Sequence, residues 1–571
     1  MKLRDLLAGI EGAAATRWAA DGAEGDPTTA ALDVEIGEVR DDSRLVQRGD
    51  LFAAIPGTAA DGTAYLADAI ARGAGAVVIE AAAGSARPAA LDGYDGVCVT
   101  VPRARHALGV IAANRHQAAQ ALALIAVTGT NGKTTTTYLN EAMLRAAGRR
   151  PGVIGTVTYR VSSGGVSAHP TPVLDGAGGG QAGASANSST GPAGPGAPTL
   201  AFSRPAPLTT PGALALHGLF AEMRDAGATD VVLEASSHAL HQGRLDGCRF
   251  RVAGLTNLTQ DHLDYHGSME AYFEAKAILF ERLLDAQAGV AVLPVDRPEG
   301  RAMRDRARGH AVLGVSSRPL GPGGGADVVV ERVEASSDGM RLRLGTPVGP
   351  LDLTSSLVGT FNLENLVLSV GMAIGRGLER DAIVAGIAGL PGVPGRLERV
   401  ANDRGVLCVV DYAHTPDALE RAIAAVRPLV APGGRLLTVF GCGGDRDRTK
   451  RPLMGEAATR DSEVAIVTSD NPRTEDPASI IAMVVEGARR TGVPEVSADA
   501  LEDTARGFCV IADRRTAIRR AVASARAGDV LVIAGKGHED YQIVGKERLH
   551  FDDREEAAVA FVAATPPGAR S

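Results

Sequence analysis

The chain has 571 residues, a formal net charge of −8 at pH 7, and a composition that is 45% hydrophobic and 22% charged. This length predicts three or four domains with buried cores, and the lack of a strongly basic block argues against nucleic acid as the main partner. No apolar run approaches the ~20 residues of a membrane span, and the N-terminus lacks the layout of a signal peptide. The five cysteines have no metal-ligand spacing and their odd number suits a reducing compartment, so we expect a soluble cytoplasmic protein.

Residues 1–120 are predicted to form a small α/β domain. Short apolar runs at 50–55 and 75–79 are typical of strands, and the pattern at 65–72 predicts an amphipathic helix between them. Within this domain lies the polar cluster Asp41-Asp-Ser-Arg44. On the residues alone, a helix cap or a solvated loop is the simpler interpretation of that cluster.

The central domain is predicted to begin with a phosphate-binding loop. The apolar run at 121–127 reads as a buried parallel strand, and Gly129, Gly132, Lys133 and Thr134 follow it at the start of a helical pattern. In this context backbone N–H groups and the helix N-terminus can bind phosphate, while the lysine reaches the β- and γ-phosphates and the threonine can bind Mg²⁺. The match to the Walker pattern is incomplete, because its first glycine falls on a valine. An ordinary strand-to-helix turn is the alternative, but it does not explain the lysine and threonine after the second glycine.

Further strands of the central domain alternate with helical segments, which predicts a doubly wound parallel sheet. Ligands of such sheets gather beyond the carboxyl ends of the strands, where Glu234, Asn257 and His262 are placed together with Lys133. These strands are predicted at 230–234, 252–255, 289–293 and 311–315.

Three polar residues of this domain have competing interpretations. Glu234 suits a second Mg²⁺ or a water on the nucleotide metal, but Ser236 and Ser237 would equally fit a helix-capping cluster. His262 could bind metal through a ring nitrogen, although a lone histidine is more often a surface or core residue. Lys276 reads as a plain helical lysine with a solvated head group.

Two segments stand apart from the sheet pattern. Residues 162–199 are rich in Gly, Ala, Ser and Pro and have no Lys, Arg, Glu or aromatic residue, so we expect a disordered surface insertion. Residues 327–357 alternate apolar and polar side chains, which predicts an antiparallel appendage.

A third α/β domain is predicted over 394–571. Each of its strands ends in a polar or glycine-rich sequence, so the strand ends together form a ligand surface. Arg446 and Arg473 in these sequences could be solvated, or their guanidinium groups could bind a carboxylate at a pocket edge. Cys442 has no evident base and is expected to be inert. The strands are predicted at 406–410, 436–440, 464–467 and 530–533, with a helix at 416–426.

Taken together, these motifs resemble those of the Mur ligase family, over essentially the whole chain outside 162–199. Each motif alone is weak, but the combination is highly specific. The polar sequences at 441–447, 470–473 and 535–539 are similar to those of the family member that uses meso-2,6-diaminopimelate. The motifs shared with the family as a whole lie at 128–135, 234–238, 257–262, 359–365 and 411–416.

The resemblance implies an ATP- and Mg²⁺-dependent ligase with a UDP-substrate domain (1–120), a central ATPase domain (121–393) and an amino-acid domain (394–571). It would join meso-2,6-diaminopimelate to the D-Glu of UDP-N-acetylmuramoyl-L-Ala-D-Glu through an acyl phosphate, in peptidoglycan precursor synthesis. A monomer is expected, with no membrane insertion. The alternatives are L-lysine as the added amino acid, a folylpolyglutamate synthase-like ligase, or, in a different class, a P-loop regulatory ATPase.

The resemblance also implies roles for single residues. Catalytic roles fall to Lys133, Lys276, His262 and Glu234. The expected ATP contacts are Gly129, Thr130, Asn131, Gly132, Lys133, Thr134, Thr135, Asn362, Asn365, Arg396 and Asp411. The expected metal ligands are Thr134, Glu234, His262 and a carbamylated Lys276. The UDP-sugar-peptide would contact Ser43, Thr209, Thr210, Ser236, Gln242 and Arg244. The amino acid would contact Arg446, Asp470, Asn471, Pro472, Arg473, Gly535 and Glu539.

The sequence departs from the family pattern at two places. Thr58-Ala-Ala60 stands where His-Gln-Ala is more usual, which puts the uridine contacts there in doubt. Gly212, in Thr209-Thr-Pro-Gly212, stands where an acidic residue is commoner. Arg473 is expected to select meso-diaminopimelate over lysine, because only the former has a second carboxylate for the guanidinium to pair with.

Overall fold

The structure is a computed structural model that describes residues 1–17, 31–57, 61–81, 88–162, 200–319 and 324–564. The chain divides into two compact units. The predicted N-terminal domain and most of the predicted central domain fall in the first unit, and the predicted amino-acid domain falls in the second. The first unit comprises Met1–Val329 and Val367–Gly386, and the second comprises Val330–Leu366 and Ile387–Ser571.

The N-terminal part of the first unit is built on a five-stranded sheet of order β1-β5-β4-β3-β2. Its strands are parallel except β1, which runs antiparallel to β5. Successive residues of β3 enter different cores, Leu51 on one face of the sheet and Phe52 on the other, so both faces are covered. The strands are β1 (Ala14–Arg17), β2 (Val39–Arg40), β3 (Leu51–Ala54), β4 (Ala76–Glu80) and β5 (Val97–Val101). The helices are α1 (Leu3–Leu6), α2 (Leu66–Ala71), α3 (Ala104–His116) and α4 (Ala118–Ala121).

The rest of the first unit contains the predicted doubly wound sheet, with strands in the order β13-β12-β11-β6-β10-β7-β8-β9. The strands are parallel from β13 to β7, and β8 and β9 are antiparallel additions at one edge. The first strand in sequence, β6, lies between β10 and β11, so the loop after β6 sits where ligands of such sheets bind. The strands are β6 (Ala123–Thr128), β7 (Pro151–Ile154), β8 (Thr158–Ser162), β9 (Leu200–Pro205), β10 (Asp230–Glu234), β11 (Phe250–Leu255), β12 (Val290–Pro294) and β13 (Ala311–Ser316). The helices are α5 (Lys133–Ala146), α6 (Ala213–Asp225), α7 (Ser237–His241), α8 (Leu263–His266), α9 (Met269–Ile278) and α10 (Pro298–Arg306).

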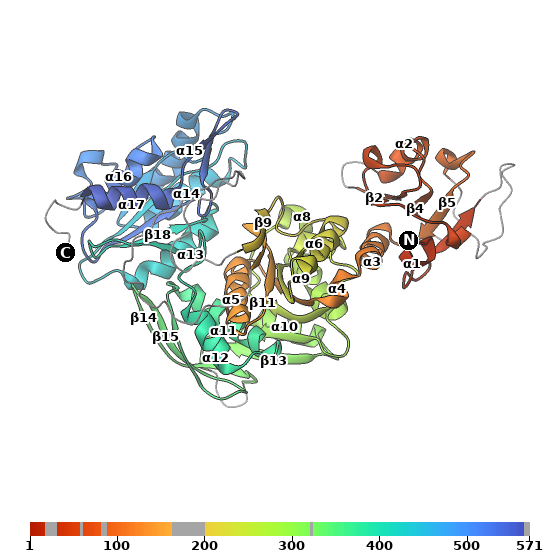
Figure 1. Ribbon diagram of the computed structural model, residues 1–571. Coiled ribbons are helices and arrows are strands. Elements are labelled where there is room, and N and C mark those ends of the chain that lie inside the picture. The colour runs from red at the N-terminus through yellow and green to blue at the C-terminus, as the bar shows by residue number, and fades with distance from the viewer. Residues whose placement is uncertain (18–30, 58–60, 82–87, 163–199, 320–323, 565–571) are drawn as a thin grey trace, which may run out of the picture. The chain divides into compact units, whose positions relative to one another are not determined.

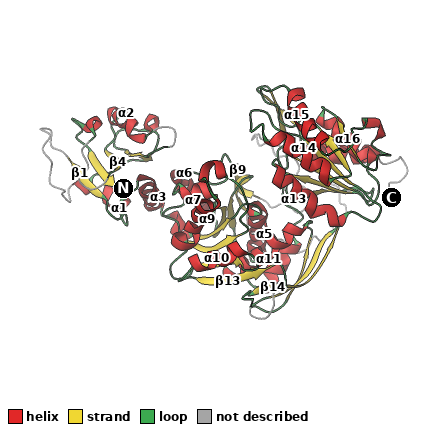
Figure 2. Ribbon diagram, turned by 180° about the vertical axis from the view of Figure 1, so that it is seen from behind, coloured by secondary structure: helices red, strands yellow, loops and turns green. Residues whose placement is uncertain are grey.

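The second unit contains a six-stranded sheet of order β17-β18-β22-β19-β20-β21, parallel except for β17. Helices α13, α14 and α15 pack on one face and α16 and α17 on the other, so the strands lie between two helical layers (Figures 1 and 2). The strands are β17 (Glu398–Val400), β18 (Leu407–Asp411), β19 (Leu436–Phe440), β20 (Val464–Val467), β21 (Gly507–Val510) and β22 (Val530–Ala534), with a hairpin of β23 (Tyr541–Val544) and β24 (Glu547–His550). The helices are α13 (Pro416–Val426), α14 (Lys450–Asp461), α15 (Pro477–Arg490), α16 (Arg514–Ser524) and α17 (Asp553–Ala564).

The predicted appendage at 327–357 consists of three strands in the order β16-β15-β14, of which β15 and β16 pair antiparallel. Two helices follow it in the chain. The elements are β14 (Val328–Ser336), β15 (Gly339–Gly345), β16 (Leu351–Ser355), α11 (Thr360–Gly375) and α12 (Arg380–Ala388).

One boundary drawn from composition needs correction. Ser162, assigned to the insertion, is instead the last residue of β8, and its buried hydroxyl donates to Glu141 Oε1 (2.9 Å). A local composition window cannot register such a long-range partner. Residues 163–199, like the Thr58-Ala-Ala60 departure, lie outside the described residues. Among the helices of the described ranges, none combines the length and apolar character needed to cross a membrane.

Candidate active site

The loop between β6 and α5 requires its first glycine. Gly129 has φ 140°, and a Cβ atom there would collide with the Thr256 hydroxyl at the end of the neighbouring strand. Gly132, with φ 89°, directly precedes α5. Glycine adopts these angles without the strain that other residues would suffer, so the chain can bring backbone N–H groups together at the N-terminus of α5.

The cation of this loop lies inside it. Lys133 Nζ donates to the carbonyl oxygens of Gly129 (2.9 Å) and Thr130 (2.8 Å). Thr134, the next residue, is buried in the first turn of α5. A helix N-terminus, glycine-rich backbone, a lysine and a threonine hydroxyl therefore meet in one place, and this set fits phosphate groups with an associated Mg²⁺.

Asn257 braces the loop from the end of β11. Its side-chain Oδ1 accepts from Asn131 N (3.0 Å), and its Nδ2 donates to Asn131 O (3.2 Å). Its backbone oxygen accepts from Thr130 N (2.9 Å). The sequence placed Asn257 at a strand end but suggested no such role. The partner is 126 residues away, so no local pattern announced it.

Lys276 does not have the solvated head group that its helical context suggested. The residue is 1% exposed, its Nζ donates to Gly129 O (3.0 Å), and it lies 4.3 Å from the centroid of the Tyr272 ring. Burial, reinforced by the nearby charge of Lys133, holds the pKa of Lys276 well below its usual range. The prediction of a solvated head group was therefore wrong, because tertiary packing decides whether the ammonium group of a helical lysine is exposed or buried.

Glu234 is buried at the end of β10, with both carboxylate oxygens in use. Its Oε1 accepts from Thr156 N (3.1 Å) and its Oε2 accepts from the Thr156 hydroxyl (3.0 Å). The neighbouring Ser236 accepts from Ala239 N and caps α7, so the capping interpretation holds for that serine. Glu234 itself is not part of the cap, and a metal role for it stays a prediction.

His262 lies beside the same loop. It is in the left-handed region (φ 55°), its side chain is 45% exposed, and its ring centroid is 4.8 Å from that of His238. Partial burial lowers the pKa of His262, the nearby Asp261 opposes this shift, and the charge of Lys133 adds to it. Within the described ranges no three His, Cys, Asp or Glu side chains are grouped to hold a metal ion. Mg²⁺ commonly has phosphate oxygens and water among its ligands.

Five residues assigned to the sugar-peptide are linked to Glu234 by a chain of hydrogen bonds. The Thr210 hydroxyl donates to Glu234 O (2.7 Å), and Arg244 Nη1 donates to Thr210 O (2.9 Å). Arg244 also donates through Nη2 to Gln242 Oε1 (2.7 Å). The remaining members are Thr209, whose hydroxyl is 3.2 Å from that of Thr156, and Ser236, whose backbone N donates to the Thr210 hydroxyl (3.1 Å).

Ser43 is a buried residue of the N-terminal domain, in a single 3₁₀ turn (Ser43–Leu45). The Asp42 side chain caps this turn by accepting from Arg44 N (3.0 Å). The capping interpretation of this polar cluster is therefore confirmed, and the uridine contact of Ser43 stays a prediction.

In the second unit, side chains assigned to the nucleotide form hydrogen bonds within the protein, most of them with backbone groups. Asn362 Nδ2 donates to Val358 O (2.7 Å) and its Oδ1 accepts from Asn365 Nδ2 (3.0 Å). Asp411 has both oxygens occupied by backbone N–H groups, Oδ2 by Leu397 (2.8 Å) and Oδ1 by Ala413 (2.9 Å). Burial raises the pKa of Asp411, and the charge of Arg396 opposes that rise.

The residues assigned to the amino acid lie at the carboxyl ends of three adjacent strands, β22, β19 and β20. Asn471 Nδ2 donates to Glu539 Oε2 (2.9 Å), which joins the loops after β20 and β22. Arg473 Nη1 donates to Gly444 O (2.7 Å), which joins the loops after β20 and β19. Gly535 (φ 118°) lies beside Asp470. The set also includes the buried Pro472 and the exposed Arg446.

Sequence reasoning missed Lys536, which has a 0% exposed side chain. Its Nζ donates to Asn471 Oδ1 (3.1 Å) and lies 3.5 Å from both Asp470 Oδ1 and Glu539 Oε2. The available signal was a lysine between two glycines at a strand end. By contrast, Cys442 behaves as expected, since burial raises its pKa to about 12 and leaves no thiolate.

Comparison with known proteins agrees with this arrangement. Family models described as "Mur ligase family, catalytic domain", "Mur ligase middle domain" and "Mur ligase, glutamate ligase domain" match residues 35–116, 127–373 and 395–537. The UDP-N-acetylmuramoyl-L-alanyl-D-glutamate–2,6-diaminopimelate ligase of Geobacter metallireducens is 45% identical over 538 residues, covering 93% of this chain and 95% of the relative. The protein of that name from Synechocystis is 40% identical over 567 residues, covering 98% and 99%.

Solved structures give the same result. One of a UDP-N-acetylmuramoyl-L-alanyl-D-glutamate–2,6-diaminopimelate ligase is 32% identical, covers 99% of both chains and has a TM-score of 0.65. A folylpolyglutamate synthase from Mycobacterium tuberculosis covers 81% of this chain and 95% of its own, with a TM-score of 0.52, but at 18% identity it shares only the fold. The chain belongs to the Mur ligase family.

Proposed function

We propose that the chain is an ATP-dependent ligase that adds meso-2,6-diaminopimelate to the D-Glu of UDP-N-acetylmuramoyl-L-Ala-D-Glu in peptidoglycan precursor synthesis. The observation that carries this proposal is the convergence of Lys133 and Lys276 on one carbonyl oxygen, that of Gly129, at the N-terminus of α5. Relatives that match over nearly their whole length are named for this reaction.

The chemical problem is to form an amide from a carboxylate, whose negative charge repels nucleophiles. Transfer of the ATP γ-phosphoryl group to the carboxylate gives an acyl phosphate and ADP; the amine then attacks its carbonyl carbon, and phosphate leaves. Lys133 and the N–H groups that begin α5 stabilise the charge on the moving phosphoryl group. Asn257 keeps the loop in the conformation that presents these groups.

Bound Mg²⁺ would neutralise part of the phosphate charge, held by Thr134, Glu234, His262 and Lys276. Lys276 contributes as a carbamate: its neutral amine attacks the carbon of CO₂, a proton is released to solvent, and an anion replaces the amine. The lowered pKa of Lys276 supports this role, because only the uncharged amine can react. The hydrogen bonds of Thr156 fix the orientation of Glu234.

The remaining proposed contacts are those with the UDP-sugar-peptide and with the nucleotide. The network of Thr209, Thr210, Ser236, Gln242 and Arg244 begins at Glu234, so it suits the peptide end of the acceptor, and Ser43 suits the uridine end. Gly129, Thr130, Asn131, Gly132 and Thr135 would contact the phosphates, and Asn362, Asn365, Arg396 and Asp411 the rest of the nucleotide. We propose further that the enzyme acts in the cytoplasm as a monomer.

The loops after β19, β20 and β22 suit the amino acid. Arg473 would pair with the far carboxylate of meso-diaminopimelate, together with Arg446 of the loop after β19, while Asp470, Asn471 and Glu539 would accept an ammonium group. Pro472 and Gly535 shape the two turns. Lysine lacks the far carboxylate and would leave the guanidinium with less to bind, which disfavours it.

The test is phosphate release with each substrate omitted in turn. The proposal predicts release only when ATP, the UDP-muramoyl-dipeptide and meso-diaminopimelate are all present, with a product mass that equals the sum of the two substrates less one water. Lys133→Ala should lose turnover and keep its thermal unfolding profile, because a loop lysine contributes little to packing. Phosphate release without an amino acid would instead indicate a regulatory ATPase, and a preference for lysine would identify the alternative ligase.

A further inference from the structure

A turn after β22 drives a lysine into the interior of the C-terminal domain. Gly535 and Gly537 flank Lys536, with φ values of 118° and 54°. A Cβ atom on Gly537 would collide with the backbone of Tyr412, and one on Gly535 would crowd the Asp470 carboxylate. The two glycines therefore let the chain pass close to its neighbours while the side chain between them turns inward.

The ammonium of Lys536 meets three residues that belong to the proposed amino-acid site. Its shortest contact is the hydrogen bond to Asn471 Oδ1 (3.1 Å). Its contacts with Asp470 Oδ1 and Glu539 Oε2 are longer, 3.5 Å each, and are ion pairs across a site where the lysine is fully buried. One cation thus connects the loop after β20 with the loop after β22.

The charges of this cluster are unbalanced. A buried carboxylate, Asp470, and a partly buried one, Glu539, share a single ammonium, so these three groups carry one surplus negative charge when both carboxylates are ionised. Burial raises the pKa of Glu539 and the charge of Asp470 raises it further, whereas Lys536 lowers it. The surplus charge matches one ammonium group of an incoming amino acid.

Three further titratable groups face Glu539, each from a different element. Tyr412 follows β18, Tyr541 begins β23, and Arg514 begins α16. Arg514 is already paired with Asp553 through two hydrogen bonds, so its charge is largely balanced locally. Asn471 is uncharged. Lys536 is the cation in direct contact with the carboxylate.

We propose that Lys536 is the positioning residue of the amino-acid site, whose buried ammonium holds Asn471 and keeps Glu539 as an oriented carboxylate ready to accept a substrate ammonium group. Lys536 acts through these residues and does not touch the substrate. The inference rests on the proposed function and deepens it. The oriented carboxylates of Asp470 and Glu539 would then explain, in physical terms, why the site binds a substrate that carries an extra ammonium group.

The test compares steady-state kinetics of the full chain and Lys536→Met over the pH range in which both are folded. Loss of the buried partner charge should raise KM for meso-diaminopimelate about 30-fold or more, with KM for ATP and for the UDP-muramoyl-dipeptide within about twofold of wild type. The carboxylate form of Glu539 exists above its pKa, and that pKa rises when the cation is removed. The acidic limb of kcat/KM for the amino acid should therefore move to higher pH.

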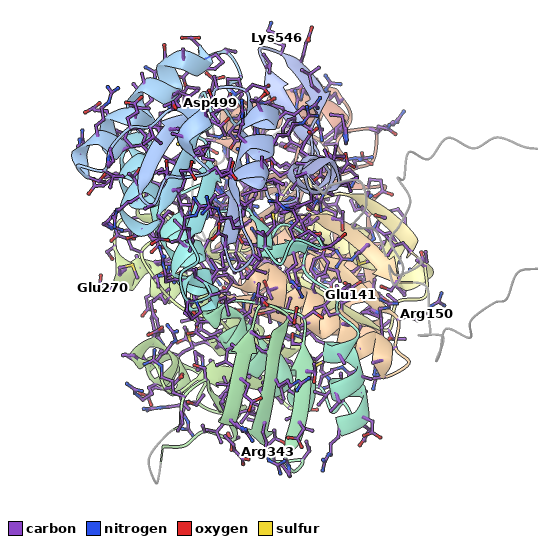
Figure 3. The ribbon with its side chains drawn as sticks, turned by 90° about the vertical axis from the view of Figure 1, so that its left-hand side faces the viewer. Glu141, Arg150, Glu270, Arg343, Asp499 and Lys546 are labelled. Atoms are coloured by element: carbon purple, nitrogen blue, oxygen red, sulfur yellow. The ribbon has the colours of Figure 1, made fainter. Side chains whose placement is uncertain are left out.

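Lys546→Met is the matched control, because Lys546 lies in the β23–β24 turn with its side chain extending into solvent (Figure 3). It should leave both KM and the acidic limb unchanged. A uniform fall in kcat/KM of Lys536→Met at every pH, with the limb unmoved, would show a merely structural role and overturn the proposal. An unchanged KM for the amino acid would overturn it as well.

If Lys536→Met does not fold, Lys536→Arg and Lys536→Gln decide the matter. The arginine keeps the charge and should keep the acidic limb of kcat/KM near its wild-type position. The glutamine keeps a donor for Asn471 but loses the charge, so its acidic limb should move to higher pH. Equal limbs in the two variants overturn the proposal. Failure of the proposed function is a separate outcome: wild type would then prefer lysine, and the same comparison made with lysine, which also carries ammonium groups, still decides the role of Lys536.

Discussion

Among the described residues, each of the two units buries one lysine completely, and the two lysines have opposite surroundings. Lys276 in the first unit contacts a carbonyl oxygen and an aromatic ring, and among the described residues no carboxylate forms an ion pair with it. Lys536 in the second unit contacts two carboxylates and an amide oxygen. Two carboxylates lie within ion-pairing distance of Lys536, whereas at Lys276 burial lowers the pKa and the charge of Asp261 opposes that effect only in part. The comparison teaches that the neighbours of a buried lysine, more than its burial, decide whether it serves as an amine or as a fixed cation.

The largest effect should follow from removing the amine. Lys276→Ala should lower kcat by about 10³-fold, because one anion near the phosphates disappears and several kcal/mol of charge stabilisation goes with it. A small carboxylic acid that fills the gap should restore part of the activity, measured as phosphate release. The same acid should do nothing for Lys536→Met. Full activity of Lys276→Ala would contradict the claim that Lys276 serves as a reactive amine.

Exchange of each lysine for arginine sharpens the comparison. Arginine keeps its charge in proteins and cannot supply a neutral amine, so Lys276→Arg should be nearly as inactive as Lys276→Ala. Lys536→Arg should keep activity within about tenfold, because the charge persists although the shape differs. The readout is kcat/KM for the amino acid in the two variants. Similar losses in both would contradict the division into an amine and a cation.

Arg473→Ala tests the site that Lys536 organises. The wild-type guanidinium should favour meso-diaminopimelate through its far carboxylate, and its removal should narrow the preference over lysine by roughly 10²-fold. The measurement is the ratio of kcat/KM for the two amino acids in wild type and variant. A ratio that does not move would place the recognition of the far carboxylate elsewhere.

The smallest effect should come from the segment that holds neither lysine. Residues 163–199 contain few large apolar side chains, so replacement by a short Gly-Ser linker should leave kcat and all KM values within a few-fold of wild type. A large rise in KM for the UDP-muramoyl-dipeptide would show instead that this segment takes part in binding.

Much of the fold could be predicted because a buried strand is recognisable from its own local sequence. The strands at 230–234, 436–440 and 464–467 were located to the residue, since continuous apolar runs between polar turns mark them. The edge strands β1 and β9 were missed. β9 exposes most of its residues, and its sequence therefore lacks an apolar pattern.

The site was predictable as a set of motifs but not as a set of contacts. Local patterns identified the phosphate loop and Glu234, but they suggested a solvated head group for Lys276, which the family resemblance overturned, and they gave Lys536 no role. Both errors have one cause. The partners of these lysines lie 147 residues away for Gly129 and 65 residues away for Asn471, and only the folded chain brings them together.

The most direct test of the ligase chemistry follows the oxygen atoms. The γ-carboxylate of D-Glu in the UDP-muramoyl-dipeptide would be labelled with ¹⁸O, and the phosphate released during turnover with ATP and meso-diaminopimelate would be analysed by mass spectrometry. An acyl phosphate keeps one carboxylate oxygen on phosphorus when the amine displaces it, so the account predicts one ¹⁸O atom in each phosphate. Phosphate without ¹⁸O, whose fourth oxygen came from water and not from the carboxylate, would contradict the account.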